Sequence, residues 1–579
     1  MTGVRRRALH WSRPGYALAL ALLVVAPLLA PGYLLLRDAV STPRSYLSDA
    51  ALGLSESAPR ATPQDFAVAL ASHLVDGGFV VKTLLVLGLW LAGWGSARLV
   101  EMVLPEAGMG GQFVAITLAI WNPYVGERLL QGHWSLLVGY GCLPWVATTM
   151  LSLRSADGPR RRGFFGLAFW IALAGLTPTG LMLAATVALV CAATPGAGLP
   201  RWLCAAATLA GAVAAALPWL TASAMGLSSP ARTWAQAPAV AAFAARAEPG
   251  LGTLGSLASL GGIWNSEALP ASRTTLFAVV AAALLLSIVA AGLPVLIRRA
   301  TAIPLLVLAA VSIVVPAVLS TRPGLALLRA LIEALPGLAV VRDGQKWVAL
   351  AVPAYALAGA GAVVTLRRWL SPAVTALVCS IALIVALPDL AWGVGGKLEP
   401  VHYPSGWWAV SAMLNDKPGT VMVLPAGSMR RFAWSGPAPV LDPLPRWVRA
   451  DVLTSGDLTV SGITIPGEGA RARAVQQLLL AGPDPAALTH STVTWLVVES
   501  RTAGDMGAAT RTLSELPTAY HDADLTLYRL GRQTAGASDR RLAAVLAHLV
   551  WLAMLTAGAV GMAVTSSRRH STHGDDTHD

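Results

Sequence analysis

The chain has 579 residues, of which 55% are hydrophobic and only 12% are charged. Soluble globular proteins carry roughly 25% charged residues, so the composition argues against a soluble protein. The formal net charge of +12 raises the possibility of a nucleic-acid binder. The arginines, however, stand at the ends of apolar runs rather than in one soluble patch, as membrane topology requires. We therefore expect a lipid bilayer, and no nucleic acid, as the partner.

Apolar runs about as long as a membrane-spanning helix recur through the chain, and they lack the polar face of a soluble helix. They predict a polytopic α-helical membrane protein with about 12 transmembrane helices. The third, fifth and sixth runs are short, which indicates tilted helices or a broken pair. The expected spans are 14–36, 79–97, 112–125, 135–153, 164–176, 179–195, 201–224, 274–297, 301–320, 347–366, 372–390 and 542–564.

Arginines in the short loops predict the orientation of these spans, because cytoplasmic loops are enriched in Lys and Arg. Clusters such as Arg5–Arg7, Arg160–Arg162 and Arg298-Arg299 fall on one side if the number of spans is even. We therefore expect a multi-pass plasma-membrane protein with both termini in the cytoplasm. The long segments then lie outside the cell: Arg37–Gly78, Met225–Arg273, Thr321–Lys346 and Ala391–Arg540.

The segment 391–540 differs in character from the rest of the chain. Short β-branched runs at Val421–Leu424, Thr494–Val498 and Leu525–Leu530 lie between Pro and Gly turns, and Ala470–Leu480 has a helical pattern. This composition predicts a small non-cytoplasmic α/β domain before the last helix. The expected divisions are 1–390 for a bundle of about 11 helices, 391–540 for the α/β domain, and 541–579 for the last helix with a disordered cytoplasmic tail.

Ionisable residues at the mouths of spans are costly and are therefore candidates for function. Asp38 follows Arg37 at the expected outer end of the first span, and Asp49 follows in the same loop. Either acid could act as a general base toward a hydroxyl group or could hold a metal. The alternative is a solvated helix end at which Arg37 and Asp38 pair with each other.

A second group of polar residues lies between the third and fourth expected spans. Pro123 should end the third span, which leaves a short interfacial segment flanked by aromatic residues. An arginine near a helix terminus suits a phosphate, whereas Trp and Tyr alone would indicate an interfacial belt. The candidates in this segment are Asn122, Tyr124, Glu127, Arg128 and His133.

A third group, Arg342, Asp343, Gln345 and Lys346, precedes the tenth expected span on the same side. Cations are disfavoured there, so they need a partner, and the phosphate of an anionic lipid is the natural one. The alternative is a salt-bridged turn that contacts the α/β domain.

A fourth group lies in the domain itself and combines aromatic residues with charges, as sugar-binding surfaces do. The same residues also occur in ordinary loop packing, which we weigh as the more frequent explanation. The group comprises Arg430, Arg431, Phe432, Trp434, Asp442 and Arg446. Sequence motifs of soluble enzymes, such as a P-loop, HExxH or GxSxG, do not occur.

The segments Trp121–Trp134, Gly139-Tyr140 and Leu143–Trp145, together with Arg342–Trp347 after Leu335–Gly337, resemble a known pattern. The pattern is that of actinobacterial glycosyltransferases of the C superfamily (GT-C). The resemblance is to the membrane region of the arabinofuranosyltransferase D type, and it covers about the first 390 residues. Four lysines beside many Arg, Ala and Gly residues fit a high-GC actinobacterium.

This resemblance implies a membrane enzyme of cell-wall biogenesis. It would transfer arabinofuranose or mannose, with inversion, from a polyprenyl-phosphate donor to a cell-envelope glycan at the outer face. The base would be Asp38, with Asp49 as second choice, and the donor phosphate would contact Arg128, Arg342 and Lys346.

The same resemblance assigns the positioning of substrate to His133, Glu127, Asp343, Asn122 and Tyr124. One departure from the family is that Ala39 follows Asp38, where the family has paired acids. This leaves open whether a divalent metal, Mg²⁺ or Mn²⁺, takes part.

Two other classes of function fit the sequence. A lipid or glycan transporter or flippase would carry charged residues along a path through the membrane, whereas the ionisable groups here gather at the outer mouth. A non-catalytic scaffold for envelope assembly would not need the acid, arginine and lysine to converge. The distribution of charge favours the enzyme.

Overall fold

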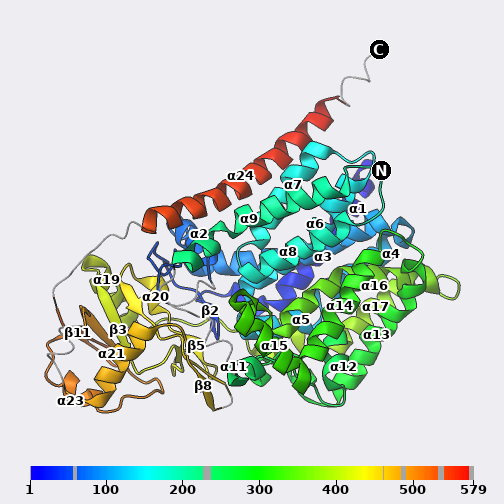
Figure 1. Cartoon of the computed structure of the whole chain (residues 1–579). Coiled ribbons are helices and arrows are strands. Elements are labelled where there is room, and N and C mark those ends of the chain that lie inside the picture. Colours follow the sequence, from blue (N-terminus) through cyan, green and yellow to red (C-terminus); the bar gives the residue numbers. More distant parts are fainter. Residues whose placement is uncertain are drawn as a thin grey trace.

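The computed structural model describes residues 2–56, 61–225, 237–460, 462–483, 491–531 and 540–572. Helices pack into a bundle at one end, a sheet region lies at the other, and the last helix runs along the outside of the bundle (Figure 1). The longer helices are α1 (Thr2–Val24), α3 (Gly77–Val103), α4 (Gly108–Ile120), α5 (Pro123–Gln131), α6 (Trp134–Arg154), α7 (Arg160–Ala174), α8 (Pro178–Ala192), α9 (Arg201–Met225), α13 (Phe277–Leu296), α14 (Ile303–Leu319), α15 (Arg322–Ala334), α16 (Val352–Leu366), α17 (Pro372–Ala386) and α24 (Arg540–Thr572).

Every expected span overlaps one of these helices, but fewer of them are long enough to cross a membrane. Six helices in the described ranges are long and apolar enough, or up to eight if each of two bent pairs counts as one span. The helices α4, α7 and α8 have 13, 15 and 15 residues. At about 1.5 Å per residue they fall short of the roughly 30 Å hydrocarbon core. The structure thus shows a helical multi-span protein.

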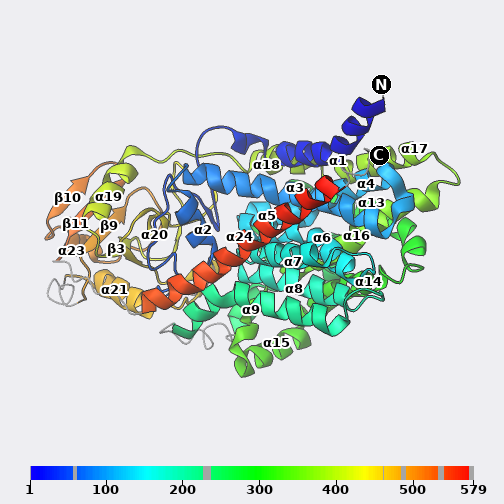
Figure 2. The same cartoon turned by 90° about the horizontal axis from the view of Figure 1, so that it is seen from above.

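The helices of the bundle approach one another closely where glycines face each other. A Cβ on Gly141 of α6 would lie 2.2 Å from the carbonyl oxygen of Gly88 in α3. A Cβ on Gly292 of α13 would lie 1.8 Å from the carbonyl oxygen of Ala358 in α16. Small residues permit this contact between helix backbones, as is usual in membrane bundles. The view from above shows α3 and α6 side by side within the bundle (Figure 2).

The first expected span is shorter than the prediction of 14–36, because α1 ends at Val24. Beyond a short 3-10 turn (Ala26–Leu29), the chain forms a β-hairpin from β1 (Leu35–Leu36) and β2 (Ala39–Val40). The end of the expected span therefore lies outside a helix, and Leu35 and Leu36 form a strand. Asp38 consequently lies at the tip of a hairpin, not at a helix end.

The sheet region has five main strands in the order β10-β11-β9-β3-β6. The strand β3 pairs in parallel with both β6 and β9, whereas β11 is antiparallel to β9 and to β10. The expected strands and helix are therefore confirmed, with boundaries moved by one or two residues. The strands are β3 (Thr420–Leu424), β4 (Met429–Arg430), β5 (Val440–Leu441), β6 (Asp451–Leu453), β7 (Leu458–Val460), β8 (Ile463–Ile465), β9 (Trp495–Glu499), β10 (Thr518–His521) and β11 (Leu525–Arg529).

Shorter helices complete the chain. Among them α18 is a left-handed turn, because Trp392 to Gly395 all have positive φ. The last helix α24 continues to Thr572, beyond the expected end of the last span, and residues 573–579 of the expected tail lie outside the described ranges. The short helices are α2 (Gln64–Ala71), α11 (Ala237–Ala242), α12 (Gly252–Ala258), α18 (Ala391–Gly396), α19 (Ser405–Asp416), α20 (Leu444–Trp447), α21 (Ala470–Ala481) and α23 (Ala509–Leu513), with 3-10 segments η5 (Pro336–Arg342) and η6 (Gly344–Ala351).

The sheet region attaches to the bundle through the hairpin of β1 and β2. The backbone N–H of Arg37 donates to the carbonyl of Pro439 at 2.8 Å, and Leu441 N–H donates to the carbonyl of Arg37 at 2.9 Å. The side chain of Leu35 is buried in the same apolar cluster as Trp407 and Val440 of the sheet region. Leu36 and Ala39 are buried in the core of the bundle, so the hairpin packs into both cores.

Candidate active site

Asp38 occupies the tip of the hairpin, held between the sheet region and the bundle. Its neighbour Arg37 has φ of 50°, a conformation that favours glycine in tight hairpins. The guanidinium of Arg37 donates to the carbonyls of Leu130, at 2.6 Å, and of Glu267, at 2.8 Å. These bonds turn Arg37 away from Asp38 and hold the strained turn in place. The local Arg37–Asp38 pair considered above therefore does not form.

The helix α5 supplies the next residues, and its end is shaped by a glycine. Asn122 caps the first turn by accepting from Val125 N–H at 3.1 Å, and Pro123 takes the first helical position. At the other end Gly132 has φ of 84°, and His133 N–H donates to the carbonyl of Arg128 at 2.9 Å. This left-handed C-cap brings the ring of His133 back beneath Arg128.

Gly132 also lets the hairpin approach. A Cβ at this position would lie 2.3 Å from the backbone nitrogen of Ala39 and 2.4 Å from the carbonyl oxygen of Leu36. The amide of Asp38 donates to the carbonyl of Gln131 at 3.2 Å. Direct backbone packing between the hairpin and the end of α5 thus places Asp38 beside His133.

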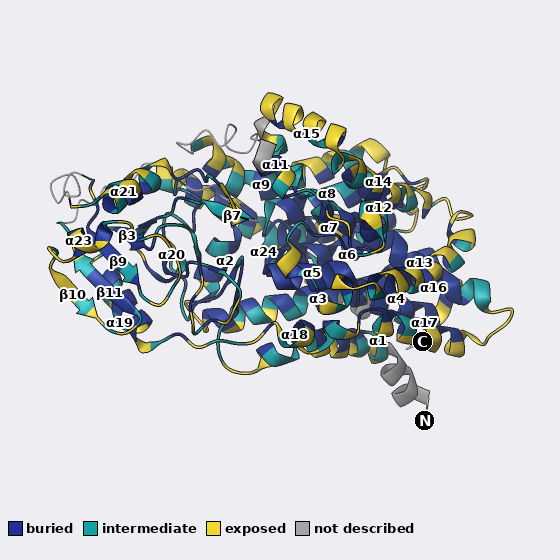
Figure 3. Cartoon of the chain, turned by 90° about the horizontal axis from the view of Figure 1, so that it is seen from below, coloured by how far each residue is buried: buried dark blue, intermediate teal, exposed yellow. Residues whose placement is uncertain are grey.

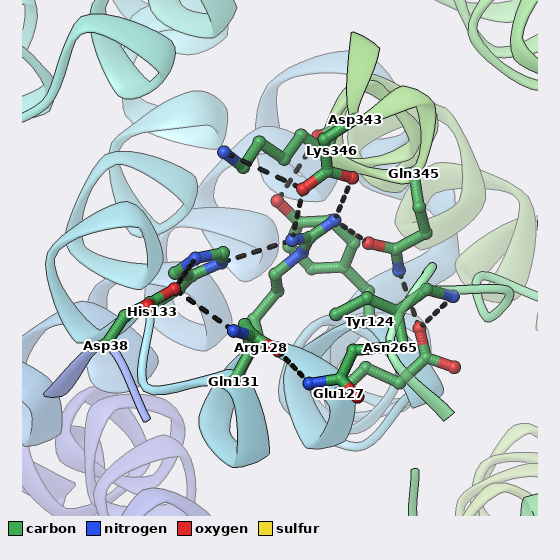
Figure 4. Close-up of polar contacts among 11 residues, drawn as sticks. Asp38, Tyr124, Glu127, Arg128, Gln131, His133, Asn265, Asp343, Gln345 and Lys346 are labelled. Atoms are coloured by element: carbon green, nitrogen blue, oxygen red, sulfur yellow. Dashed lines mark hydrogen bonds and ion pairs between the residues drawn. The ribbon is translucent and has the colours of Figure 1, made fainter. Parts of the chain in front are cut away.

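A continuous series of polar contacts connects Asp38 to Lys346 (Figure 4). His133 Nε2 lies 2.9 Å from Asp38 Oδ2, and Arg128 Nη1 lies 3.1 Å from His133 Nδ1. The guanidinium of Arg128 donates to both carboxylate oxygens of Asp343, at 3.0 and 3.1 Å. Lys346 Nζ lies 3.6 Å from Asp343 Oδ2. We call these five side chains the Asp38–Lys346 network.

The contacts determine which nitrogen of His133 carries the proton. Arginine only donates hydrogen bonds, so the Nδ1 atom that faces Arg128 must accept. Burial lowers the pKa of His133 below its ordinary value of 6.5, and the nearby charges of Lys346 and Arg128 act in the same direction. The imidazole is therefore neutral at neutral pH, with its proton on Nε2, and it donates to Asp38.

The carboxylate of Asp38 is ionised in this setting. Burial acts to raise its pKa, but the hydrogen bonds from His133 and Gln131 and the charge of Lys346 outweigh it, so the pKa lies below its ordinary value. Gln131 Nε2 donates to Asp38 Oδ2 at 3.1 Å, and Asn265 in turn donates to Gln131 Oε1 at 2.8 Å. The charge of Arg128 likewise holds the pKa of Asp343 well below its ordinary value, against the effect of burial.

The two ends of the network are open and its centre is closed. The side chain of Asp38 is 39% exposed and that of Lys346 is 24% exposed, whereas Arg128 is 0% exposed. Arg128 already contacts Asp343, His133 and Gln345, which leaves it in a position to orient His133 rather than to meet a ligand. An open acid and an open cation are the groups that a substrate can reach.

The other predicted site residues lie around the network with different contacts. Tyr124 OH donates to the carbonyl of Lys346 at 3.2 Å, and its ring lies 5.6 Å from the guanidinium carbon of Arg128. Asn122 also donates to the carbonyl of Leu118 at 2.9 Å, so its amide joins the end of α4 to the start of α5. The guanidinium of Arg342 stacks over the ring of Phe243, 3.8 Å from its centroid.

Glu127 faces away from Asp38 into a second buried group. Its carboxylate accepts from the backbone N–H groups of Gly262 and Ile263, at 3.1 and 3.0 Å, and from Gln345 Nε2 at 2.9 Å. Burial and the neighbouring carboxylate of Glu248 raise the pKa of Glu127 well above its ordinary value. Glu127 therefore fastens the segment 262–263 to the site.

Asp49 is not joined to the network by any contact described for it. Its carboxylate pairs with Arg541 near the start of α24, and Arg541 also donates to the carbonyl of Leu47 at 2.7 Å. This ion pair ties the first loop to the last helix. The geometry thus favours Asp38 over Asp49 as the acid of the site.

The sequence reasoning missed two amide side chains, Gln131 and Asn265, which support Asp38. The amide of Gln345, which the sequence did indicate, connects Arg128 to Glu127. Gln131 follows Glu127 by four residues on α5, a spacing that puts both on one side of a helix and offered a signal. Asn265 contacts Gln131 across 134 positions of the chain, and the sequence offers no signal for a contact between residues so far apart.

Metal binding was left open by the sequence. In the described ranges, no group of three or more His, Cys, Asp or Glu side chains is arranged to hold a metal ion. The Asp38–Lys346 network contains three side chains of the metal-ligating types, Asp38, His133 and Asp343. Arg128 lies between His133 and Asp343 and contacts both.

The fourth predicted group is mostly part of the interior of the sheet region. Arg430 is buried in an ion pair with Glu499, and Phe432 and Trp434 stack on each other with centroids 4.9 Å apart. Arg446 pairs with Asp65 of α2, 3.1 Å from its Oδ2. These contacts agree with ordinary packing, the alternative that we weighed as more frequent.

Comparison with solved structures identifies a related fold. The bundle and sheet region align with the arabinofuranosyltransferase AftD from mycobacteria, with a TM-score of 0.53 over 92% of this chain at 18% identity. The fold is shared with AftD. Two structures of an AftD mutant align similarly, with TM-scores of 0.54 and 0.51 at 18% and 17% identity, over 92% and 90% of this chain.

The chain spans 40% to 42% of the length of these AftD structures. No family model matches the sequence, and no curated protein matches it. At this level of identity the likeness to AftD establishes a similar three-dimensional arrangement and leaves the chemistry to be argued from the side chains.

Proposed function

We propose that this protein is a GT-C-like membrane glycosyltransferase. It would transfer arabinofuranose or mannose from a polyprenyl-phosphate donor to a cell-envelope glycan at the outer face of the membrane. The observation that carries the proposal is the Asp38–Lys346 network, which has a partly exposed carboxylate at one end and a partly exposed ammonium at the other. The AftD-like fold supports the class of reaction.

In this proposal Asp38 is the base. As the hydroxyl oxygen of the acceptor attacks the anomeric carbon, its proton moves to Asp38, and the phosphate of the donor leaves with the electrons of the broken C–O bond. Attack opposite to the leaving phosphate inverts the configuration at that carbon. A positioned base of this kind typically contributes about 10² to 10⁴ in rate.

The remaining residues of the network hold these groups in place. His133 keeps one oxygen of Asp38 oriented through its Nε2 proton, and Arg128 keeps His133 in that tautomer. Lys346 would meet the negative charge on the departing phosphate, with Arg342 as a second cation nearby in the chain. Arg128 acts as a positioning residue, because its guanidinium is buried against Asp343.

The proposed reaction agrees with the predicted topology. A polyprenyl-phosphate donor reaches its enzyme from within the bilayer, so the site must lie at a membrane surface. We therefore retain both termini in the cytoplasm, the twelve-span arrangement and a plasma-membrane location as parts of the proposal. Residues 391–540 would form the extracytoplasmic domain.

Transfer assays with purified protein in lipid nanodiscs test the proposal. The donors are decaprenyl-phosphoryl arabinose and decaprenyl-phosphoryl mannose, and the released lipid phosphate and the elongated glycan are both measured. We expect the Asp38→Asn variant to lose about 10² to 10⁴ in rate with an unchanged thermal unfolding midpoint.

The Asp49→Asn variant discriminates the two candidate acids and should retain transfer. Full activity of folded Asp38→Asn protein would refute Asp38 as the base. If the wild-type protein releases sugar from neither donor, this substrate assignment is wrong.

A further inference from the structure

We propose that α15 lies flat in the headgroup region of the membrane, with one apolar face inserted toward the lipid acyl chains. The helix follows α14, and the two are long and apolar enough for a membrane span only when taken together, with a bend of 96° between them. If α14 crosses the bilayer, a helix at nearly a right angle to its end lies parallel to the membrane surface. This inference concerns the membrane contact alone and does not depend on the proposed transfer reaction.

The side chains of α15 divide into three sectors around the helix. Gly324, Leu328 and Ile332 recur every four residues and are buried. They pack with Val240 of α11 and with Leu338, which follows α15 in the chain. This sector fastens the helix to the protein.

The second sector is charged. It carries Arg322, Arg329 and Glu333, and Arg329 Nε lies 3.8 Å from Glu333 Oε1. Both members of this pair are about half exposed, at 47% and 58%. The spacing of seven and then four residues places the three charges on one side of the helix.

The third sector is apolar and exposed. Leu327 and Leu331 are 55% and 40% exposed, and Leu335 just beyond the helix end is 60% exposed. Pro323, Ala330 and Ala334 on the same side of the helix are also exposed. Figure 3 shows α15 as a largely exposed helix at the edge of the bundle. An exposed leucine face beside a charged face is the pattern of interfacial helices, which insert about 5–10 Å into the headgroup boundary.

The neighbouring helix α14 indicates that the leucine face of α15 contacts lipid rather than a protein partner. Val307, Val311 and Val318 of α14 are 57%, 49% and 56% exposed, so α14 already presents an apolar surface suited to hydrocarbon. The exposed leucines of α15 follow α14 directly in the chain. The chain then runs through η5 to Arg342, and Lys346 follows in η6.

Site-directed spin labelling of the full chain in lipid nanodiscs tests the inference. The four native cysteines are buried, so labels at introduced cysteines dominate the signal. Labels are placed at Leu327→Cys and Leu331→Cys, with Arg329→Cys as the matched control on the same helix and Val311→Cys as the reference for lipid. Accessibility is measured with oxygen, which partitions into lipid, and with a water-soluble nickel chelate.

We expect both leucine positions to resemble Val311→Cys, with oxygen accessibility above that of the chelate, and Arg329→Cys to show the reverse. Chelate accessibility at the leucine positions as high as at Arg329→Cys would place this face in water and overturn the inference. Exclusion of both reagents would place the leucine face against protein and would also overturn the inference. Transfer activity does not enter this readout, so failure of the membrane-contact inference can be distinguished from failure of the proposed function.

Discussion

Two buried arginines, each paired with carboxylates, show how similar residues serve different purposes in this protein. Arg128 contacts Asp343 at the mouth of the bundle, and Arg430 contacts Glu499 and Asp442 in the sheet region. Both arginines are almost fully buried. The Arg430 cluster is closed on every side, because Glu499 and Asp442 are 0% and 4% exposed.

The Asp38–Lys346 network differs because its ends reach the surface. In the Arg430 cluster, burial and the neighbouring Asp442 raise the pKa of Glu499 well above its ordinary value. Asp38 has a pKa below its ordinary value and remains ionised while partly exposed. A charged group that stays ionised and accessible can act on a substrate, whereas a closed cluster contributes to the fold.

The largest effects should come from removing each arginine. The Arg128→Met and Arg430→Met variants each remove the arginine that pairs with a buried carboxylate, which costs about 3–5 kcal/mol of folding free energy. In protein that remains folded, we expect Arg128→Met to abolish transfer because His133 loses the donor that sets its tautomer. Arg430→Met should retain transfer.

Thermal unfolding in detergent and transfer rates in nanodiscs measure the two quantities separately. A folded Arg430→Met protein without transfer would show that the two clusters are coupled, and the distinction drawn above would fail.

Removing the partly exposed cation Lys346 should lower the transfer rate without lowering stability. In Lys346→Gln we expect a loss of about 10² in the transfer rate, because an electrostatic contact to the departing phosphate is removed. Lys397→Gln is the matched control, since this exposed lysine bonds only the carbonyl of Leu269, at 2.9 Å, among its described contacts. Equal rates for both variants would remove Lys346 from the site.

Alanine substitutions at two glycines with similar backbone conformations distinguish the effect of backbone strain from the effect of displacing the hairpin. Gly132 and Gly436 have φ of 84° and 96°, so alanine at either costs about 1–2 kcal/mol. A Cβ at Gly436 meets nothing within 4 Å, whereas one at Gly132 meets the backbone of the hairpin that carries Asp38. We therefore expect Gly132→Ala, and not Gly436→Ala, to lower the transfer rate as well as the unfolding temperature.

The smallest effect should appear in the pH dependence. The pKa of His133 is lowered in the folded protein relative to 6.5, so its contribution to stability is complete above that pH and is lost as the pH falls through the folded-state pKa. Protonation also puts a hydrogen on Nδ1 facing Arg128. Transfer should therefore decline on the acid side with a midpoint below pH 6.5, and a midpoint above 6.5 would contradict the tautomer assigned to His133.

Much of the helical part of the fold could be predicted from periodicity and composition. The expected span 201–224 nearly coincides with α9, because a long apolar run leaves few alternatives. The apolar pattern places Leu35 and Leu36 in the first helix, but they form a strand. A short apolar run suits either structure, and only pairing with β2 and burial of Leu35 against the sheet region decide between them.

The candidate site was predicted in part. The choice of Asp38, Arg128, His133 and Lys346 depended on residue type and on position near the ends of spans, which are local properties. The role expected for Arg128 as a phosphate ligand does not suit its burial against Asp343, 215 positions away. No local pattern distinguishes a cation that meets substrate from one that is neutralised by a distant acid.

What the sequence by itself determined was the membrane environment, the positions of most helices and the presence of a strand-rich segment, because these follow from local hydrophobicity. Which polar residues meet one another was decided only by tertiary structure. Asp38 and His133 are 95 positions apart, and they touch because Gly132 admits the hairpin and the sheet region holds it there. Such contacts depend on packing between distant backbones, which no local property of the chain encodes.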